Sequence, residues 1–181
     1  KVAEGWDPAK AAVAGAQCRA YGAAGLMRIP ERLHITWQGD NILRVDTDAG
    51  MQTRLLHFDN PAGARVAAQP TWQGVSTASW DAASGVPGQA GNVAQFGSLG
   101  SLHGTTTGMR PGYLRKNGVP YSANAVLAED WHAMREDGAD WLVIYTTVTD
   151  PVYLSRPWRT NPVFEREPDG RKWHRSPCSS R

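Results

Sequence analysis

The stretch RLHITWQGDNILRVDTDAGMQTRLLHF, residues 32–58, decides the fold of this 181-residue chain. Apolar and polar residues alternate over 33–37, which is the two-residue period of a strand with one buried face. The alternation returns over 43–48 and again over 52–58, each time after a short turn rich in Gly, Asp or Asn. Three strands joined by tight turns predict an antiparallel meander.

The same reasoning predicts further strands, near residues 74–80, 99–107, 123–131, 141–149 and 160–165. About eight strands suit a closed antiparallel barrel with room for one small ligand, so an all-β barrel is predicted, with a β-sandwich as the alternative. The uniform composition predicts a single domain over 1–181, with a short N-terminal helix at about 8–18 and an irregular C-terminal tail at about 168–181. The Gly-rich segment 82–100 is either a loop at the barrel mouth or a surface insertion.

Two cysteines, Cys18 and Cys178, lie near opposite ends of the sequence. A disulfide between them would constrain the unfolded chain by roughly 5 kcal/mol in the chain-entropy model, and would indicate export to an oxidising compartment. Two free thiols are the alternative. Because the chain begins at Lys1, we expect that a signal peptide has been removed, and we predict a periplasmic or secreted location. No apolar run approaches the roughly 20 residues needed to span a bilayer, so no transmembrane segment is predicted.

Three motifs resemble a largely uncharacterised family of small exported β-proteins of Gram-negative bacteria: WQGVSTASW (72–80), RPGYLRKNGVPY (110–121) and TDPVYL (149–154). The resemblance extends over about Leu33 to Pro157 and implies a lipocalin-like barrel. It implies no catalytic assignment for individual residues. Gly104 departs from the expected pattern, because it interrupts a strand where a β-branched residue would fit better, and the register near His103 is therefore open.

Several function classes are disfavoured by what the sequence lacks. A formal net charge of +2 is too small to indicate a nucleic-acid partner. Phosphate-binding glycine loops, nucleophile elbows and Cys-x-x-Cys pairs are absent, so no cofactor is predicted. The histidines show no paired helical spacing, and no metal is predicted, although strands could still bring His34, His57 and His103 together.

A first candidate cluster comes from the three strands of the meander and contains His34, Asp46, Asp48 and Arg54. If these side chains share the inner face of a barrel, their proton affinities would be perturbed. Asp48 or His34 would then act as a general base, and Arg54 would stabilise developing negative charge. In the alternative, these side chains point outward and the apolar residues between them fill the core.

A second candidate pair is Tyr113 and Arg115, which share one face of an extended segment and would donate a proton and bind an anionic or aromatic group. A hairpin arm with solvated charges is the alternative. Six of the eight tryptophans are enough to line a pocket for an aromatic ligand, although core filling explains most of them equally well. They are Trp37, Trp72, Trp80, Trp131, Trp141 and Trp158. The residues predicted to contact a ligand are Trp37, His103, Glu129, Trp131, Trp141 and Tyr145.

Two functions follow from these predictions. The first is an exported barrel enzyme of the lyase, hydratase or isomerase type, which would perform cofactor-independent acid-base chemistry on a small aromatic or polycyclic substrate. The second is a periplasmic carrier that binds a small hydrophobic ligand without changing it, since a fold by itself does not imply chemistry. A structural module of the cell envelope, with a filled barrel, is a third possibility.

Overall fold

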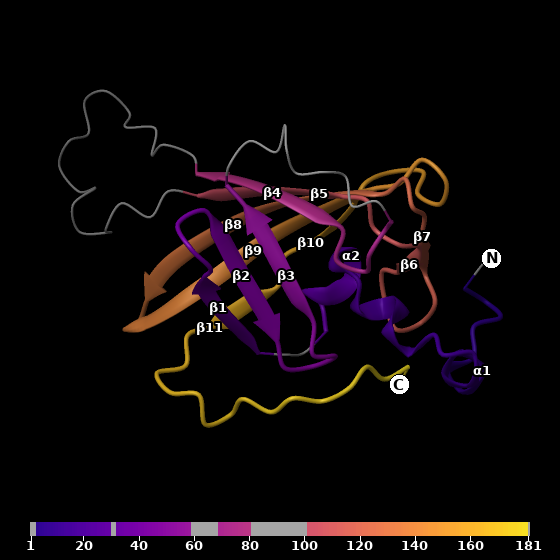
Figure 1. Ribbon diagram of the computed structural model, residues 1–181, viewed down its shortest axis with the longest axis horizontal. Helices are drawn as coiled ribbons and strands as arrows, with labels where there is room; N and C mark the ends of the chain where they lie inside the picture. Colours follow the sequence, from indigo (N-terminus) through magenta and orange to yellow (C-terminus); the bar gives the residue numbers. More distant parts are fainter. Residues whose placement is uncertain (1–2, 30–31, 59–68, 81–100, 181) are drawn as a thin grey trace.

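One large sheet dominates the protein, as seen in a computed structural model that describes residues 3–29, 32–58, 69–80 and 101–180 (Figure 1). Its strands follow the order β1-β2-β3-β4-β5-β8-β9-β10, and β11 also pairs with β9. Their bounds are β1 Leu33–Trp37, β2 Ile42–Thr47, β3 Thr53–His57, β4 Val75–Trp80, β5 Leu102–Thr107, β8 Val126–Glu136, β9 Ala139–Thr149, β10 Trp158–Thr160 and β11 Val163–Glu165. Two short strands, β6 Gly112–Tyr113 and β7 Pro120–Tyr121, form a separate hairpin.

The predicted meander is confirmed, because β1, β2 and β3 pair antiparallel in chain order. The next step differs from a simple meander, since β3 and β4 pair in parallel. A parallel pair needs a long crossover, and the connection between His57 and Val75 has the length for one. Antiparallel pairing resumes from β4 to β5, β8 and β9.

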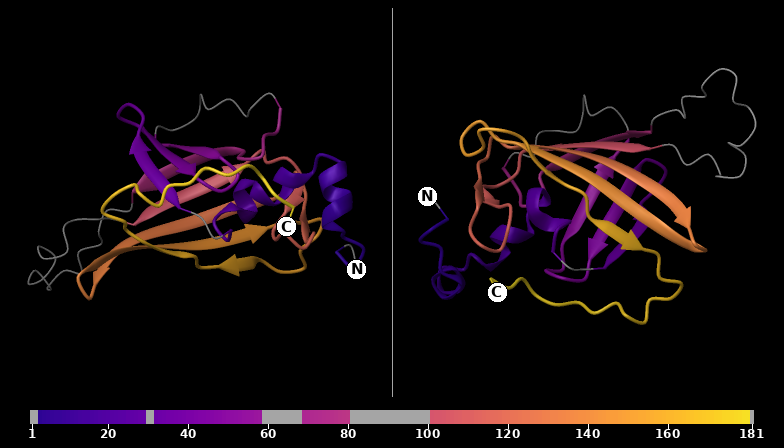
Figure 2. Two further views of the ribbon diagram at one scale, coloured as in Figure 1. Left: turned by 90° about the horizontal axis from the view of Figure 1, so that it is seen from below. Right: turned by 180° about the vertical axis from the view of Figure 1, so that it is seen from behind.

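The sheet curls into a half-barrel, which confirms the all-β, barrel-like class. Figure 2 shows β1 to β3 and β8 to β11 facing each other across the curl, with α2 at one end between them. The path of paired strands ends at β1 on one side and at β10 on the other. Strands β10 and β11 occupy successive stretches of the same free edge of β9.

Strand β5 continues without interruption through Gly104, which pairs with Ala78 on β4 and Glu129 on β8. A Cβ placed on Gly104 would meet no atom closer than 3.8 Å, so the glycine is not required by a close approach. The register at the neighbouring His103 is regular, with Ser79 and Asp130 as its partners.

The first N-terminal helix is shorter than predicted, and two further short helices follow it. Helix α1, Pro8–Val13, begins at Asp7, whose carboxylate accepts hydrogen bonds from the backbone N–H groups of Ala9 and Lys10. It ends early because the chain turns at Gly15, which has a φ of 67°. A 3₁₀ helix, η1, Gln17–Tyr21, and a single turn of helix, α2, Ala23–Leu26, follow. None of the described helices is long and apolar enough to span a membrane.

The buried face of the sheet is its concave face, and α2 packs against one end of it. Ala23 and Ala24 join a cluster with Leu127 and Val148, while Met27 joins a second cluster with residues of β2, β3, β4, β5, β8 and β9. These two apolar clusters lie inside the curl and form most of the core, and a third, around Tyr21 and Leu26, lies at the N-terminal helices.

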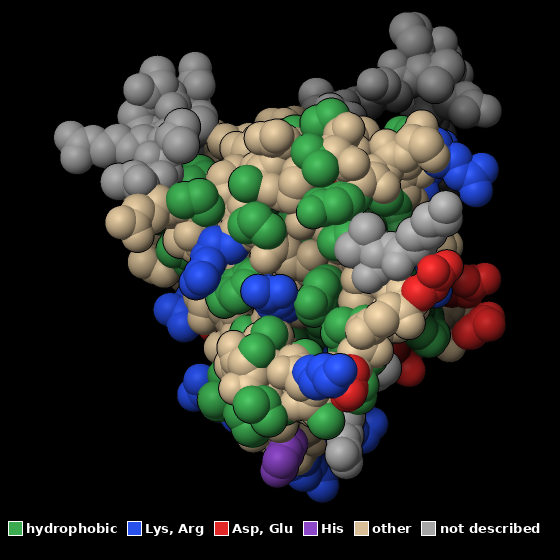
Figure 3. All heavy atoms as spheres, turned by 90° about the vertical axis from the view of Figure 1, so that its right-hand side faces the viewer, with side chains coloured by type: hydrophobic (Ala, Val, Ile, Leu, Met, Phe, Trp, Pro, Cys, Tyr) green, Lys and Arg blue, Asp and Glu red, His purple; other side chains and the backbone are tan. Residues whose placement is uncertain are grey.

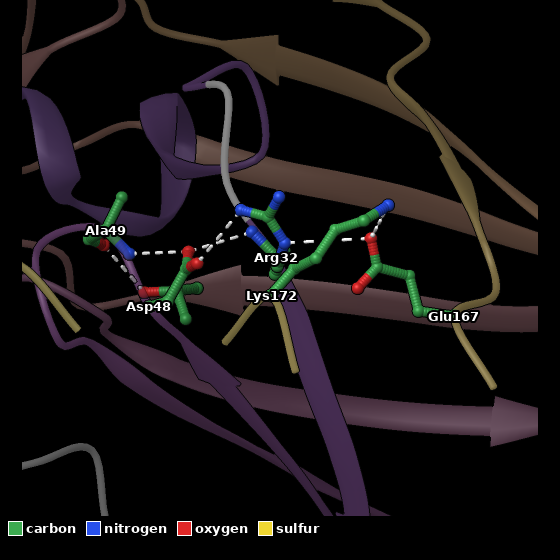
Figure 4. A network of polar contacts seen from close by, with 6 residues as sticks. Arg32, Asp48, Ala49, Glu167 and Lys172 are labelled. Atoms are coloured by element: carbon green, nitrogen blue, oxygen red, sulfur yellow. Dashed lines mark hydrogen bonds and ion pairs between the residues drawn. The ribbon is translucent and has the colours of Figure 1, made fainter. Parts of the chain in front are cut away.

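The segment 166–180, here named the C-terminal strap, crosses the open side of the half-barrel (Figure 2). It leaves β11 and reaches the β1 edge, where Glu167 forms ion pairs with Arg32 and Lys172 at 3.7 and 3.0 Å (Figure 4). Further along, Trp173 packs edge-on against His34 with 5.9 Å between ring centroids.

The strap then pairs with the end of β2 and is fixed covalently. The Ser176 N–H donates to the carbonyl of Asp48, and the Gly50 N–H donates to the carbonyl of Ser176. Two residues later, Cys178 forms a disulfide with Cys18 of η1. The predicted disulfide is confirmed. The strap also connects the β11 side of the sheet to the β1 and β2 side, which strand pairing leaves unconnected.

Candidate functional site

A row of three aromatic rings lies at one end of the concave face. Trp37 lies directly opposite the buried Leu43 on β2. Phe58 and Trp80 each lie two residues after a buried residue of their own strand, Leu56 and Ala78. All three rings therefore point to the inner side of the sheet. The ring centroids of Trp37 and Phe58 are 5.3 Å apart, and those of Phe58 and Trp80 are 5.4 Å apart with nearly parallel planes.

The outer two of these rings are half-exposed on a face that is mostly buried, and Ile35 beside Trp37 on β1 is exposed as well. Trp37 and Trp80 have relative exposures of 52% and 49%. Phe58 between them packs against the second core cluster, so the row is continuous with the core. An aromatic surface with a partly buried ring between two half-exposed rings is suited to stacking a flat apolar group.

The floor beside the aromatic row is apolar and includes Trp131. Trp80, Leu102, Trp131 and Ile144 lie opposite one another on β4, β5, β8 and β9, so they form one line across the concave face. Trp131 is only 4% exposed, and its Nε1–H has no hydrogen-bond partner among the described residues. A buried donor without an acceptor is costly, and a ligand carbonyl or ether oxygen would satisfy it.

Beyond this floor lies a buried polar layer centred on Arg54 and Glu129. Arg54 donates from Nη1 and Nη2 to the two carboxylate oxygens of Glu129 at 3.0 and 2.6 Å. Arg54 also donates to the Thr106 hydroxyl at 3.3 Å, and that hydroxyl is 2.7 Å from the hydroxyl of Ser76. Because both charged side chains are almost fully buried, each neutralises the other inside the curl.

The four residues of the first predicted cluster do not meet at one place. His34 and Asp46 lie opposite each other on the outer face of β1 and β2. Asp46 accepts hydrogen bonds from Arg44 and Thr53, and the Arg44 contact, which outweighs the effect of burial, holds the pKa of Asp46 below its usual value. Arg54 lies on the opposite, concave face.

Asp48 is buried at the end of β2, where it orders the backbone (Figure 4). Its Oδ1 accepts hydrogen bonds from the backbone N–H groups of Arg32 and Ala49 at 2.8 and 2.7 Å. The Arg32 guanidinium lies 3.5 Å from the other carboxylate oxygen. These contacts give Asp48 a role in fixing the start of β1 against the end of β2.

Tyr113 and Arg115 lie on the β6–β7 hairpin, away from the aromatic row. The Tyr113 hydroxyl accepts a hydrogen bond from Arg19, whose guanidinium also lies over the ring. Arg115 stacks on Trp158, with 5.1 Å between the guanidinium carbon and the ring centroid. The two side chains therefore have different partners.

The six predicted ligand contacts divide between the two faces of the sheet. Trp37, Glu129 and Trp131 lie on the concave face, and Glu129 is engaged by Arg54. The other three have outward parity. Among these, His103 contacts the carboxylate of Asp130, and Tyr145 packs edge-on against His132. Trp141 pairs with Met134 and Glu165 at the start of β9.

A hollow lies on the outer side of the parallel β3–β4 pair, with a volume of about 390 Å³. Its lining combines polar side chains with Leu55, Val75 and Trp72, and the Arg110 guanidinium covers the Trp72 ring at 4.6 Å. The residues around it are Gln52, Thr53, Leu55, His57, Thr71, Trp72, Gln73, Gly74 and Val75. Over the described ranges, no group of three or more His, Cys, Asp and Glu residues is placed to hold a metal ion.

Phe58 is absent from the site predicted by sequence, and Trp80 was predicted only as one of six tryptophans that could line a pocket. Their parity indicates the inner face, because Phe58 follows Arg54 and Leu56 at two-residue steps and Trp80 follows Ser76 and Ala78. Comparisons with models of protein families, with curated proteins and with solved structures find no match to this chain.

Proposed function

We propose that this protein is an exported carrier that binds a small, flat, apolar molecule on the concave face of its half-barrel. The observation that carries this proposal is the pair of half-exposed indoles, Trp37 and Trp80, ordered on either side of Phe58. Stacking against such rings covers apolar area on both partners and favours aromatic ligands.

The Nε1–H of Trp131, which has no hydrogen-bond partner among the described residues, adds a preference to this site. It lies on the same line of residues as Trp80, two strands away. The preferred ligand is therefore a planar hydrocarbon framework that carries one hydrogen-bond acceptor, because that acceptor pairs with a donor that is otherwise unsatisfied.

Binding without chemistry is favoured over acid-base catalysis by the state of the polar residues. The two carboxylate oxygens of Glu129 are both occupied by Arg54, and His34 and Asp46 have outward parity. A general base must be free to take a proton from the ligand, and both the ion pair of Glu129 and the outward parity of His34 and Asp46 act against this at the aromatic row. The disulfide fits an oxidising location such as the periplasm.

The test measures binding of the neutral aromatic probe N-phenyl-1-naphthylamine by its fluorescence, followed by competition with a panel of aromatic and polycyclic metabolites. We expect Trp37→Ala and Trp80→Ala each to weaken binding by about 10-fold, which corresponds to the loss of one stacking partner. Trp141→Ala is the matched control, since it removes an indole of outward parity and leaves binding unchanged.

Mass spectrometry of the incubated metabolites separates the carrier from the enzyme. A ligand recovered unchanged supports the carrier. A new product that disappears in Glu129→Gln would instead establish a lyase or isomerase. Equal weakening in Trp141→Ala and Trp80→Ala would contradict the concave site.

A further inference from the structure

The end of the molecule that holds α2 and the β6–β7 hairpin carries a surface of cations stacked on aromatic rings. All five cation–π pairs found among the described residues lie here. They are Arg19 on Tyr113, Arg28 on Trp158, Arg110 on Trp72, Arg115 on Trp158 and Lys116 on Tyr21. We name these residues the arginine-aromatic face. Figure 3 views this end and shows Lys and Arg side chains interspersed with hydrophobic ones, with most acidic side chains confined to one edge.

Two arginines of this face share one indole. The guanidinium carbons of Arg28 and Arg115 lie 4.8 and 5.1 Å from the centroid of the Trp158 ring. Arg28 also donates to the carbonyl of Leu114 at 3.3 Å. Burial, and after it the nearby charge of Arg115, lowers the pKa of Arg28. Like charges are thus gathered at one ring.

No carboxylate of the described ranges forms an ion pair with Arg19, Arg28, Arg110 or Arg115. This differs from the rest of the protein, where several other arginines pair with acids. Those pairs are Arg32 with Asp48 and Glu167, Arg44 with Asp46, Arg54 with Glu129, Arg135 and Arg166 with Asp140, and Arg171 with Asp169. Within the described residues, these four arginines therefore form a group of positive charges without a carboxylate partner.

Exposed apolar side chains accompany these charges. Val152 and Tyr153 lie in the connection between β9 and β10, which Figure 1 places at the same end as the β6–β7 hairpin. Their relative exposures are 55% and 47%. Arginine, tryptophan, tyrosine and an exposed valine together match the interface of a lipid bilayer, where phosphates meet the edge of the hydrocarbon.

We propose that the arginine-aromatic face docks on the surface of a membrane that contains anionic phospholipids. Arg28 and Arg115 take lipid phosphate beside Trp158, Arg19 and Arg110 add charge around them, and Tyr153 enters the headgroup region. A free polyanion would use the arginines equally well, but it would gain nothing from the exposed Val152 and Tyr153. The aromatic row of the concave face lies away from this surface, so the inference does not depend on the proposed carrier function.

The experiment is co-sedimentation of the full oxidised protein with vesicles of phosphatidylcholine mixed with phosphatidylglycerol, compared with vesicles of phosphatidylcholine alone. We expect binding to the anionic vesicles only, falling steeply as the salt concentration rises from about 0.05 M to about 0.5 M. Each exposed arginine near the surface is worth about fivefold in affinity, so the double variant Arg110→Gln/Arg115→Gln binds about 25-fold more weakly.

The matched control is Arg135→Gln/Arg166→Gln, which removes the same charge from residues that flank Asp140. It leaves vesicle binding nearly unchanged, and Tyr153→Ser lowers the binding that persists at high salt. The proposal is overturned by equal binding to neutral vesicles, by equal loss in both double variants, or by no sedimentation with anionic vesicles. Binding of inorganic phosphate without vesicle binding, seen by NMR of the Trp158 indole, also overturns it.

Discussion

Arg54 and Glu129 join through two parallel hydrogen bonds of 3.0 and 2.6 Å although their strands, β3 and β8, are separated by β4 and β5. The contact is possible because the sheet curls, which brings inward side chains of distant strands together. The pair lies between the two apolar clusters and ties the two sides of the half-barrel to each other.

Removing one partner of this pair leaves an isolated buried charge. We expect Glu129→Ala to lower the free energy of unfolding by about 3–5 kcal/mol. The double variant Arg54→Met/Glu129→Leu removes both charges and recovers most of that loss, because it replaces them with apolar groups of similar size. Urea unfolding followed by circular dichroism measures both values.

The control for this prediction is the pair of Arg44 and Asp46 on the outer face, which is also bidentate. Because water reaches these side chains, Arg44→Gln changes stability far less than Glu129→Ala. Similar effects of the two substitutions would show that burial does not determine the contribution of the Arg54 pair.

Alanine substitutions at two glycines with positive φ allow the cost of backbone strain to be measured apart from the cost of a packing clash. Gly50 and Gly138 have φ values of 76° and 81°, but only at Gly50 would a Cβ collide, at 2.2 Å from the Tyr21 ring. Gly138→Ala costs roughly 1–2 kcal/mol for the left-handed backbone. Gly50→Ala costs about 1–3 kcal/mol more because it also displaces Tyr21. Equal melting temperatures of the two variants would contradict the packing argument.

Breaking the disulfide detaches the C-terminal strap. We expect Cys18→Ser/Cys178→Ser to lose up to roughly 5 kcal/mol of stability, because the covalent loop is long. Trypsin cleavage after Arg171, Lys172 and Arg175 should become several-fold faster under native conditions, since the strap then leaves the β1 edge more often. Mass spectrometry identifies the cut sites. Unchanged cleavage would show that Trp173 and Ser176 hold the strap without the covalent link.

Asp150 makes stability depend on pH at the acid end. Burial alone would raise its pKa, but hydrogen bonds from Ser122, Val152 and Tyr153 outweigh burial and lower the pKa from 3.8. A lowered folded-state pKa means that this stabilisation is present above about pH 4 and is lost as the pH falls through the folded-state pKa.

Asp150→Asn tests this dependence. The variant is less stable than the parent at pH 7 by about 1.5–3 kcal/mol, which is the scale of a hydrogen bond to a charged group. The difference shrinks below pH 4 and is measured by urea unfolding across the acid range. A constant difference from pH 7 to about pH 2 would exclude Asp150 as the source of the dependence.

Much of the sheet was predictable from sequence because the two-residue period survives wherever one face is buried. Residues 43–47 and 75–78 show this alternation in their burial and lie in segments that were predicted as strands. Residues 33–37 were also predicted as a strand from their sequence, although Ile35 and Trp37 on the inner side are exposed. The period fails in residues 132–140, where both faces of the β8–β9 hairpin meet water. The extension of β8 to Glu136 and the turn at Asp137 and Gly138 were therefore not predicted.

The site was less predictable because parity gives the face of a residue but not its distant partner. Parity correctly separates Asp46 from Arg54, yet nothing local in the sequence pairs Arg54 with Glu129. The parallel pairing of β3 and β4 was unpredictable for a similar reason, because the direction of β4 depends on the side of the sheet at which the long connection before it ends. The aromatic row was within reach, because Trp37, Phe58 and Trp80 each continue an inward series of their own strand.

The link between Cys18 and Cys178 turns 161 residues of this chain into a covalent ring, because 160 positions separate the two cysteines in sequence. The exposed turn between β8 and β9 lies within this ring. A single protease cut at that turn therefore leaves one molecule, since the disulfide keeps the two fragments joined.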